Sequence, residues 1–357
     1  MTNKEVIKRK NMTQLAVYRS YLCRHPRLTY LFVELTNRCN LRCLHCGSSC
    51  EQASGQFIET SALLHALKEV AEDLDPRGVM VCLTGGEPLL HPDFYRIASA
   101  IRELGFPWGI TTNGTLIDET AALLMKAAGL GSITVSLDGL DASHDWLRCS
   151  QGSFERTVQG IKALQKASIP VQVTTVVHKR NFAELEPMFQ LMKDLQVSSW
   201  RAINIEPIGR ALEDRSLLLN RREILDLLAF IRTKRFSPDT PMDVRYGCSH
   251  YLSFEYEHEL RDNYFLCGAG ILVGSILCNG DIASCLDIER RPELVQGNIA
   301  RDRFVDVWKH GFAAFRRDRS ELNETCRTCR ERDFCAADSM HTWDFDNHRP
   351  MFCFLNS

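Results

Sequence analysis

The sequence predicts an α/β fold, in which a partial barrel of six parallel strands precedes a small cysteine-rich domain. Six apolar, strand-like runs recur between residues 29 and 235, and segments with helical periodicity separate them. Six strand–helix units are fewer than the eight of a closed β/α barrel, so one side would stay open. The rhythm stops after about residue 235, where eight cysteines follow, and this change predicts the second domain.

The predicted strands follow one another along the first two thirds of the chain. They are Tyr30–Leu35, Val79–Leu83, Trp108–Thr112, Ser132–Leu137, Val171–Val177 and Trp200–Ile205. Between them, Ser61 and Ser153 are residue types that commonly begin helices. Strands that alternate with helices pair in parallel through right-handed crossovers, so their carboxyl ends meet at one rim.

The segments on either side of the barrel differ in character. Residues 1–28 form a basic, polar arm, which we expect to be solvated or to cover the open bottom of the barrel; a docking surface for a peptide partner is the alternative. Phe236–Pro241 is typical of a linker. Within residues 236–357, Asn279–Asp281 predicts a β-hairpin and Phe304–Phe315 a helix. The apolar pattern there is too sparse for a large core, so metal sites would supply stability.

Composition excludes several classes of protein. The chain has 357 residues and a net charge of −2, which gives no strong attraction to nucleic acid or to an anionic membrane. It contains no signal-peptide pattern and no apolar run long enough to span a membrane. The 15 cysteines cluster at short spacings, as metal-binding cysteines do in a reducing compartment, so we expect a cytoplasmic protein.

Cys39, Cys43 and Cys46 form a C-x3-C-x2-C loop directly after the first predicted strand. A cubic 4Fe–4S cluster takes about one thiolate per iron, so three thiolates would leave one iron open for chemistry. The loop lies at the rim where β/α barrels place their active sites. A zinc knuckle or buried structural thiols are the simpler alternatives.

Polar turns that contain glycine follow the next three predicted strands. Gly85–Pro88 ends the second strand; its two glycines would let the backbone approach a ligand, and Glu87 would offer a carboxylate to an ammonium group. Thr112–Gly114 ends the third strand and Ser136–Gly139 the fourth. Each turn alone is compatible with an ordinary strand-to-helix connection. Together they surround the rim beside the cysteine loop and predict a binding site there.

From Tyr30 to Gly209 the chain resembles the radical S-adenosylmethionine (SAM) enzymes, because the cysteine loop and the strand-end motifs occur in the same order as in that family. The resemblance implies that a 4Fe–4S cluster on Cys39, Cys43 and Cys46 binds SAM at its open iron and cleaves it reductively. The resulting 5′-deoxyadenosyl radical would abstract hydrogen from a substrate. An external electron donor of the flavodoxin or ferredoxin type is implied as a partner.

The same resemblance gives SAM-binding roles to residues at the rim. Glu87 and its Gly85–Pro88 segment would hold the SAM ammonium group, while Ser136 and Arg148 would contact the SAM carboxylate or ribose. His45 would pack near adenine. SAM carries both charges, so its site needs an anion, a cation and close backbone donors. The full set of candidates is His45, Gly85, Gly86, Glu87, Asn113, Ser136, Asp138 and Arg148.

The C-terminal part resembles the SPASM extension of this superfamily. The cysteines that fit its pattern are Cys267, Cys285, Cys326, Cys329, Cys335 and Cys353. By resemblance, the last four would hold a complete auxiliary 4Fe–4S cluster; a zinc ribbon is the alternative. A second auxiliary cluster would retain the first two, with Cys278 as a candidate third ligand. Ser339 stands where its fourth cysteine belongs, so that ligand would be Asp338, Ser339, substrate or nothing, or the cluster would be absent.

Enzymes with a SPASM extension mostly modify peptides, so the first hypothesis is an oxidative modification or cross-link in a ribosomally made peptide. Alternatives are epimerisation with Cys248 or Cys278 as hydrogen donor, sulfatase-maturase-like oxidation, small-molecule dehydrogenation, and a non-enzymatic electron-transfer module. The sulfatase alternative ranks low because Asp287 comes one residue later than the family's base, and in a strand one position reverses the face. Asp338–Asp344 would line the substrate channel or form a surface loop.

Overall fold

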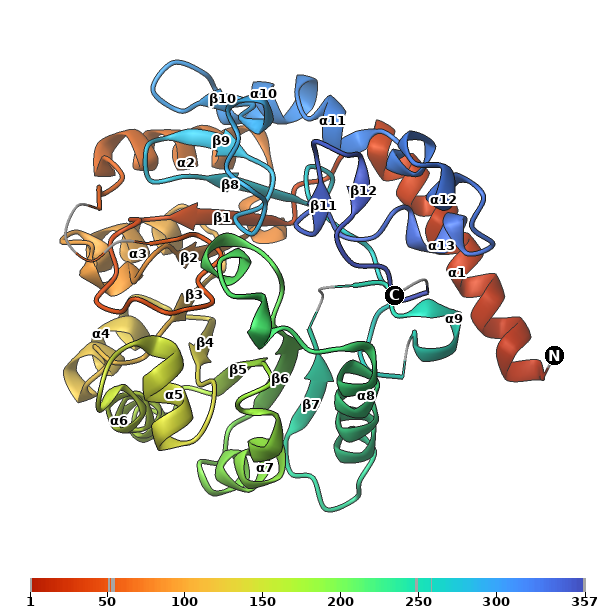
Figure 1. Ribbon diagram of the computed structural model, residues 1–357. Helices are drawn as coiled ribbons and strands as arrows, with labels where there is room; N and C mark the ends of the chain where they lie inside the picture. Colours follow the sequence, from red (N-terminus) through yellow and green to blue (C-terminus); the bar gives the residue numbers. More distant parts are fainter. Residues whose placement is uncertain (1, 51, 53–54, 248–249, 258, 356–357) are drawn as a thin grey trace.

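A single ten-stranded sheet organises the protein (Figure 1). The computed structural model describes residues 2–50, 52, 55–247, 250–257 and 259–355. Six consecutive strands pair in parallel in sequence order, which confirms the predicted partial barrel. They are β1 Tyr30–Glu34, β2 Met80–Thr84, β3 Trp108–Thr112, β4 Ser132–Ser136, β5 Val171–Val177 and β6 Ser199–Asn204.

Helices join these strands and cover the outer face of the sheet (Figure 1). Leu63 and Leu67 of α2 and Ile97 and Ile101 of α3 are fully buried, because helical spacing places them on one face toward the strands. The barrel helices are α2 Thr60–Asp73, α3 Phe94–Glu103, α4 Glu119–Ala127, α5 Asp141–Arg148, α6 Ser153–Lys166, α7 Leu185–Asp194 and α8 Arg221–Arg235.

Short strands from the C-terminal part extend the sheet at both edges. The strand β7 (Asp243–Tyr246) pairs in parallel with β6, and β8 (Val273–Ile276) pairs in parallel with β1. The predicted hairpin is confirmed, since β8 and β9 (Asp281–Ala283) are antiparallel. A second small hairpin lies apart from the main sheet. The remaining strands are β10 Gly297–Asn298, β11 Trp343–Asp344 and β12 Arg349–Pro350.

The C-terminal part has only short helices. The helix predicted over Phe304–Phe315 is divided in two at Phe312, whose φ of 63° lies in the left-handed region. These short helices are α9 Ser253–Tyr256, α10 Phe304–His310, α11 Ala313–Arg316, α12 Glu324–Arg327 and α13 Arg332–Cys335. Every helix among the described residues is too short or too polar to cross a membrane.

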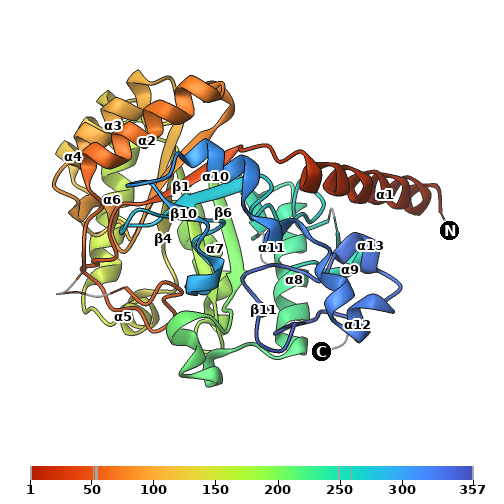
Figure 2. The same ribbon diagram turned by 90° about the horizontal axis from the view of Figure 1, so that it is seen from above.

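The N-terminal arm is a long helix, α1 (Asn3–Arg24), which begins at a capping box formed by Thr2 and Glu5. We expected a solvated arm or a cover over the bottom of the barrel; most residues of α1 are exposed, and Met12 and Leu22 are buried. The helix lies against α13 and the rest of the C-terminal part, as Figure 2 shows. Met12 packs with Tyr251 and Phe265. The helix therefore lies on apolar side chains that come from a distant part of the sequence.

Replacement of Met12 by alanine should therefore destabilise the protein. Met12 is 3% exposed, and the loss of a buried methionine side chain costs about 2–5 kcal/mol. Val17 lies on the same helix with 68% exposure, so Val17→Ala is the matched control and should change the unfolding free energy little. Anaerobic urea denaturation measures both. Equal effects of the two variants would contradict the packing of α1 described above.

Candidate active site

The cysteine loop follows β1 and is held by main-chain hydrogen bonds to the turn after β2. Gly86 N donates to Thr36 O at 2.7 Å, and Glu87 N donates to Arg38 O at 3.0 Å. Cys39 and Cys43 are 8% and 7% exposed, whereas Cys46 is partly exposed. Main-chain hydrogen bonds thus attach the loop that carries the candidate ligands to the end of the sheet.

Gly85 and Gly86 permit this contact because they lack side chains. A Cβ atom on Gly85 would lie 2.3 Å from Thr36 O, and one on Gly86 would lie 2.2 Å from Arg38 O. Gly85 also has a φ of 147°, which favours glycine. The sequence indicated that these glycines admit a ligand. In the structure, the space beside the two glycines is occupied by the main-chain oxygens of Thr36 and Arg38, directly before Cys39.

Glu87 is fully buried between the second and third strand ends. Its Oε1 accepts hydrogen bonds from the Thr112 hydroxyl at 2.8 Å and Leu89 N at 3.2 Å, and its Oε2 accepts one from Asn113 N at 2.9 Å. Burial raises the pKa of Glu87 to about 7. The carboxylate thus orients the Thr112–Asn113 turn, and its role toward the SAM ammonium group stays a prediction.

Asn113 connects that turn to the cysteine loop. Its side-chain amide donates to Asn40 Oδ1 at 2.8 Å and lies 4.0 Å from the Cys39 sulfur. Ser136 ends β4 at the same rim, opposite Thr174 of β5. The ends of the third and fourth strands therefore lie at the same rim as the cysteine loop, as the sequence predicted.

A buried ion pair between Asp138 and Arg148 lies beside the middle cysteine. Arg148 Nη1 is 3.5 Å from the Cys43 sulfur, and His45 Nε2 is 3.7 Å from Asp138 Oδ2. Burial lowers the pKa of His45 to about 3, so its ring is neutral. His45, Asp138 and Arg148 are thus gathered around Cys43, although they come from three elements.

These residues fit the cofactors that the sequence implies. Burial raises the pKa of the Cys39 thiol to about 12, and such a thiol loses its proton when it binds a metal. His45 Nδ1 and Arg148 Nε are buried and have no hydrogen-bond partner within the described part of the chain. Buried polar atoms normally have partners, so the pair fits a polar ligand next to the thiols.

Arg210 is a site residue that the sequence did not reveal. It follows β6 in a short 3-10 helix, η4 (Gly209–Leu212), and its side chain donates to Cys43 O at 2.7 Å and Cys50 O at 2.9 Å. Gly209 has a φ of 53°, and a Cβ there would lie 2.3 Å from Cys46 O. The Gly209-Arg210 pair at a sixth strand end was the available signal.

The four cysteines predicted to hold a complete auxiliary cluster line one cavity of about 200 Å³. They are Cys326, Cys329, Cys335 and Cys353. The described cysteines form no disulfide bonds with one another. No three His, Cys, Asp or Glu side chains in the described residues converge as around a single metal ion. A cubane cluster is a different case, because each thiolate binds its own iron.

The candidate ligands of a second auxiliary cluster make contacts in several parts of the C-terminal region. Cys267 and Cys285 line different cavities, of about 260 and 420 Å³. The main-chain N–H of Cys278 donates to Glu34 at 3.1 Å, beside β1. Both oxygens of Asp338 are engaged, by Tyr251 N at 2.8 Å and by His250 Nδ1 at 2.9 Å. Their ligand roles stay predictions, and Cys248 lies outside the described residues.

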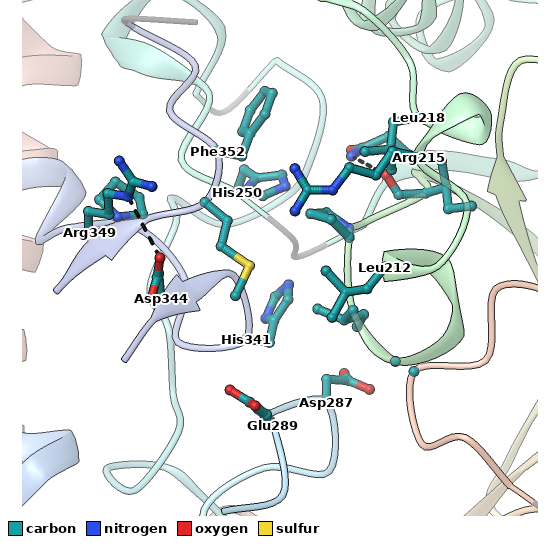
Figure 3. Close-up of a pocket in the computed structure, with 18 of the residues that line it drawn as sticks. Leu212, Arg215, Leu218, His250, Asp287, Glu289, His341, Asp344, Arg349 and Phe352 are labelled. Atoms are coloured by element: carbon teal, nitrogen blue, oxygen red, sulfur yellow. Dashed lines mark hydrogen bonds and ion pairs between the residues drawn. The ribbon is translucent and has the colours of Figure 1, made fainter. Parts of the chain in front are cut away.

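A cavity of about 850 Å³ lies between the barrel and the C-terminal part (Figure 3). Gly47–Ser49 form one wall directly after Cys46, and Asn204–Leu212 contribute another after β6. His341 and Asp344 also line the cavity, and the role of the Asp338–Asp344 segment toward a substrate stays a prediction. The cavity therefore reaches from the cysteine loop to the C-terminal hairpin.

A chain of alternating charges forms one wall of this cavity. Glu206 Oε1 lies 3.1 Å from His250 Nε2, and Glu206 Oε2 lies 2.6 Å from His341 Nε2. Burial opposes a charge on His250, but the carboxylates of Asp338 and Glu206 outweigh it and raise the pKa of His250 to about 10. These buried ion pairs join the barrel to the C-terminal part.

Asp287 corrects an argument made from the sequence. The strand β9 ends at Ala283, so Cys285–Asp287 lie in a turn and not in a strand. The reversal of side-chain direction expected at Asp287 therefore does not apply. In Figure 3 Asp287 faces the cavity near His341. The reason for ranking sulfatase-maturase-like oxidation low is thereby removed.

The open barrel with thiols at its carboxyl rim defines an iron–sulfur enzyme of the β/α class. Residues 33–192 match the radical SAM superfamily, and residues 267–330 match SPASM, an iron–sulfur cluster-binding domain. An AdoMet-dependent heme synthase of Methanosarcina barkeri is 31% identical over 326 residues, which cover 87% of this chain and 90% of that protein. The chain belongs to the radical SAM superfamily. Its domains imply a 4Fe–4S cluster with SAM and auxiliary iron–sulfur clusters.

Two further proteins are informative. The PqqA peptide cyclase of Gluconobacter oxydans is 27% identical over 312 residues, covering 85% of this chain and 84% of that protein. The solved structure of anSMEcpe with bound AdoMet and Cp18Cys peptide has a TM-score of 0.72 at 18% identity, covering 92% of this chain and 94% of that one. At that identity the likeness shows the fold.

Replacement of Gly86 by alanine should displace the cysteine loop. The new Cβ would lie 2.2 Å from Arg38 O and 3.0 Å from the Cys39 Cβ, so the strand-end turn and the loop must separate. We expect anaerobic reconstitution to load roughly four fewer iron atoms per chain. Gly78→Ala is the matched control, because no atom lies within 4 Å of its Cβ position. Full iron content and unchanged SAM affinity in the Gly86 variant would disprove this account.

The stability contributed by His250 should depend on pH. Its folded-state pKa of about 10 lies above the ordinary value of about 6.5, so the contribution is complete below pH 6.5 and is lost as the pH rises toward 10. The difference in unfolding free energy between wild type and His250→Gln should shrink over that range in anaerobic denaturation. His65→Gln is the control, because the His65 side chain is 72% exposed. A difference that grows with pH would refute the charge assignment.

Proposed function

We propose that this radical SAM enzyme is an oxidoreductase whose substrate occupies the cavity of about 850 Å³. When bound, the cluster and SAM supply a 5′-deoxyadenosyl radical that removes a hydrogen atom from substrate. The observation that carries the proposal is that Gly47–Ser49, directly after Cys46, line this cavity. Its volume falls within the range of about 300–1,000 Å³ that is typical of ligand pockets.

The protein's own residues would bind and orient the cofactors. Cys39, Cys43 and Cys46 would hold the cluster as thiolates. Arg148 lies 3.5 Å from the Cys43 sulfur and would contribute the positive charge near the SAM carboxylate, with Asp138 fixing its direction. Arg210 keeps the loop closed through its bonds to Cys43 O and Cys50 O.

For the substrate we favour an iron tetrapyrrole that carries carboxylate groups. The relative of M. barkeri named a heme synthase is matched over 90% of its length, which supports this class. The cavity also presents cations, since His341 and Arg215 line it and Figure 3 shows Arg215 directed toward its middle. A guanidinium binds a carboxylate through two parallel hydrogen bonds, so Arg215 suits a propionate-type group.

A ribosomally made peptide, the first hypothesis from the sequence, is the second candidate. The peptide cyclase of G. oxydans supports it through its match over 84% of that protein. Acidic side chains also face the cavity, because Asp287 and Glu289 belong to its lining. Such carboxyl groups accept hydrogen bonds from the N–H groups of a peptide and repel the carboxylates of a porphyrin. The acidic side chains of the cavity therefore favour a peptide, and its basic side chains favour a porphyrin.

SAM cleavage is the first expected outcome. The full-length protein, reconstituted anaerobically and given reductant and SAM, should release 5′-deoxyadenosine, which liquid chromatography measures. Cys43→Ala should abolish the release because one iron loses its ligand. The absence of cleavage in wild type with and without candidate substrates would rule out the enzymatic proposal.

Iron coproporphyrin III and a candidate precursor peptide, each incubated with the reconstituted enzyme, separate the two substrate classes. We expect the porphyrin to increase 5′-deoxyadenosine release and to change in mass, with a smaller effect in Arg215→Gln. A peptide that loses two hydrogens would instead establish cross-linking or oxidation. A peptide of unchanged mass that gains solvent deuterium would establish epimerisation.

A further inference from the structure

Arg319 is a buried cation without a carboxylate partner in the described part of the chain. It begins the short helix η7 (Arg319–Leu322) and is 6% exposed. Its Nη2 donates to Asp338 O at 2.6 Å and its Nη1 to Ser339 O at 3.5 Å. The guanidinium lies over the ring of Trp343 at 4.9 Å.

Such an arrangement leaves a charge poorly compensated. Removal of an ion from water costs several kcal/mol in proteins, and main-chain carbonyls or a ring offset only part of that cost. The Cys267 and Cys335 thiols line the same cavity as Arg319. The negative charge that would balance Arg319 is therefore expected on a group bound near these thiols.

The position of Arg319 identifies where that charge would be. Arg319 lines the cavity of about 260 Å³ together with Cys267 and Cys335. Cys335 and Asp338 also line the adjoining cavity of about 200 Å³ that contains the four auxiliary cysteines. Arg319 thus lies beside Cys335, one of the four cysteines predicted to bind the auxiliary cluster.

We propose that Arg319 is the countercharge of the auxiliary iron–sulfur cluster and raises its reduction potential. A cluster held by four thiolates is anionic, and its negative charge increases by one on reduction. A fixed cation nearby stabilises the reduced form more than the oxidised form. This inference rests on the cofactors of the family and holds for either proposed substrate.

The consequence concerns the second electron of an oxidation. The substrate loses a hydrogen atom to the radical that SAM supplies, and a two-electron oxidation then requires one further acceptor. A higher potential makes the auxiliary cluster a better acceptor of that electron. Arg319 would therefore set the direction of electron flow without touching the substrate.

The test uses the full chain with Cys39, Cys43 and Cys46 all changed to alanine, so that only auxiliary iron remains. In this background Arg319→Met removes the charge and Arg319→Lys keeps it. We expect a more negative midpoint potential in the methionine variant and a value closer to the parent in the lysine variant. Redox titration followed by electron paramagnetic resonance measures both, with iron content determined in parallel.

Arg316→Met provides the matched control. Arg316 lines the same cavity of about 260 Å³, donates to main-chain carbonyls and lies over the rings of Trp308 and Phe312. The cysteine that acts on its charge is Cys23, which is no predicted ligand, whereas Cys267, Cys335 and Cys326 act on Arg319. Arg316→Met should shift the potential less than Arg319→Met.

Three outcomes would overturn the proposal: equal shifts in the Arg319→Met and Arg316→Met variants, equal shifts in the Arg319→Met and Arg319→Lys variants, or no shift with full iron. If the methionine variant loses its iron, retention by the lysine variant supports the charge role, and equal loss in both contradicts it.

Discussion

The candidate site depends on the direct contact between the cysteine loop and the backbone of its neighbours. Thr36 O and Arg38 O accept hydrogen bonds from the turn after β2, while Cys46 O accepts one from Arg210 N after β6. These contacts require that the glycines on each side lack a Cβ atom. A loop fixed through its own carbonyls holds three thiols in place before any cofactor binds, and this preorganisation is what a reactive cluster needs.

Buried charges connect the barrel to the C-terminal part. Glu34 at the end of β1 pairs with Arg290 and accepts the N–H of Cys278, and Glu206 after β6 pairs with His250 and His341. For the Glu206–His250 pair, both of whose side chains are buried, removal of one partner costs about 3–5 kcal/mol, because the other charge stays buried and unpaired. The wall of the large cavity is therefore fixed by the same ion pairs that join the two parts.

The sequence predicted those structural features that depend on a local pattern of apolar and polar residues. All six barrel strands were correct to within one residue, because each is an apolar run bounded by polar turns. The short strand β7 was not predicted, and β8 was predicted only as part of a hairpin, because the pairing of these strands with β6 and β1 depends on contacts distant in sequence. The surface that receives α1, and the partners of Glu206, come from segments distant in sequence, so no local spacing reveals them.

The same contrast between local and long-range features distinguishes the predicted cofactor site from the large cavity proposed to bind substrate. The rim that is predicted to bind SAM is built from residues adjacent to strand ends, and its motifs can be identified one by one in the sequence. The large cavity combines Ser49, Arg215, Asp287 and His341, which come from four separate segments. Such a wall can change by single substitutions while the rim stays intact. Relatives named for a heme and for a peptide are therefore compatible with one barrel. On the function proposed above, the charges that face the cavity would decide between the two substrate classes.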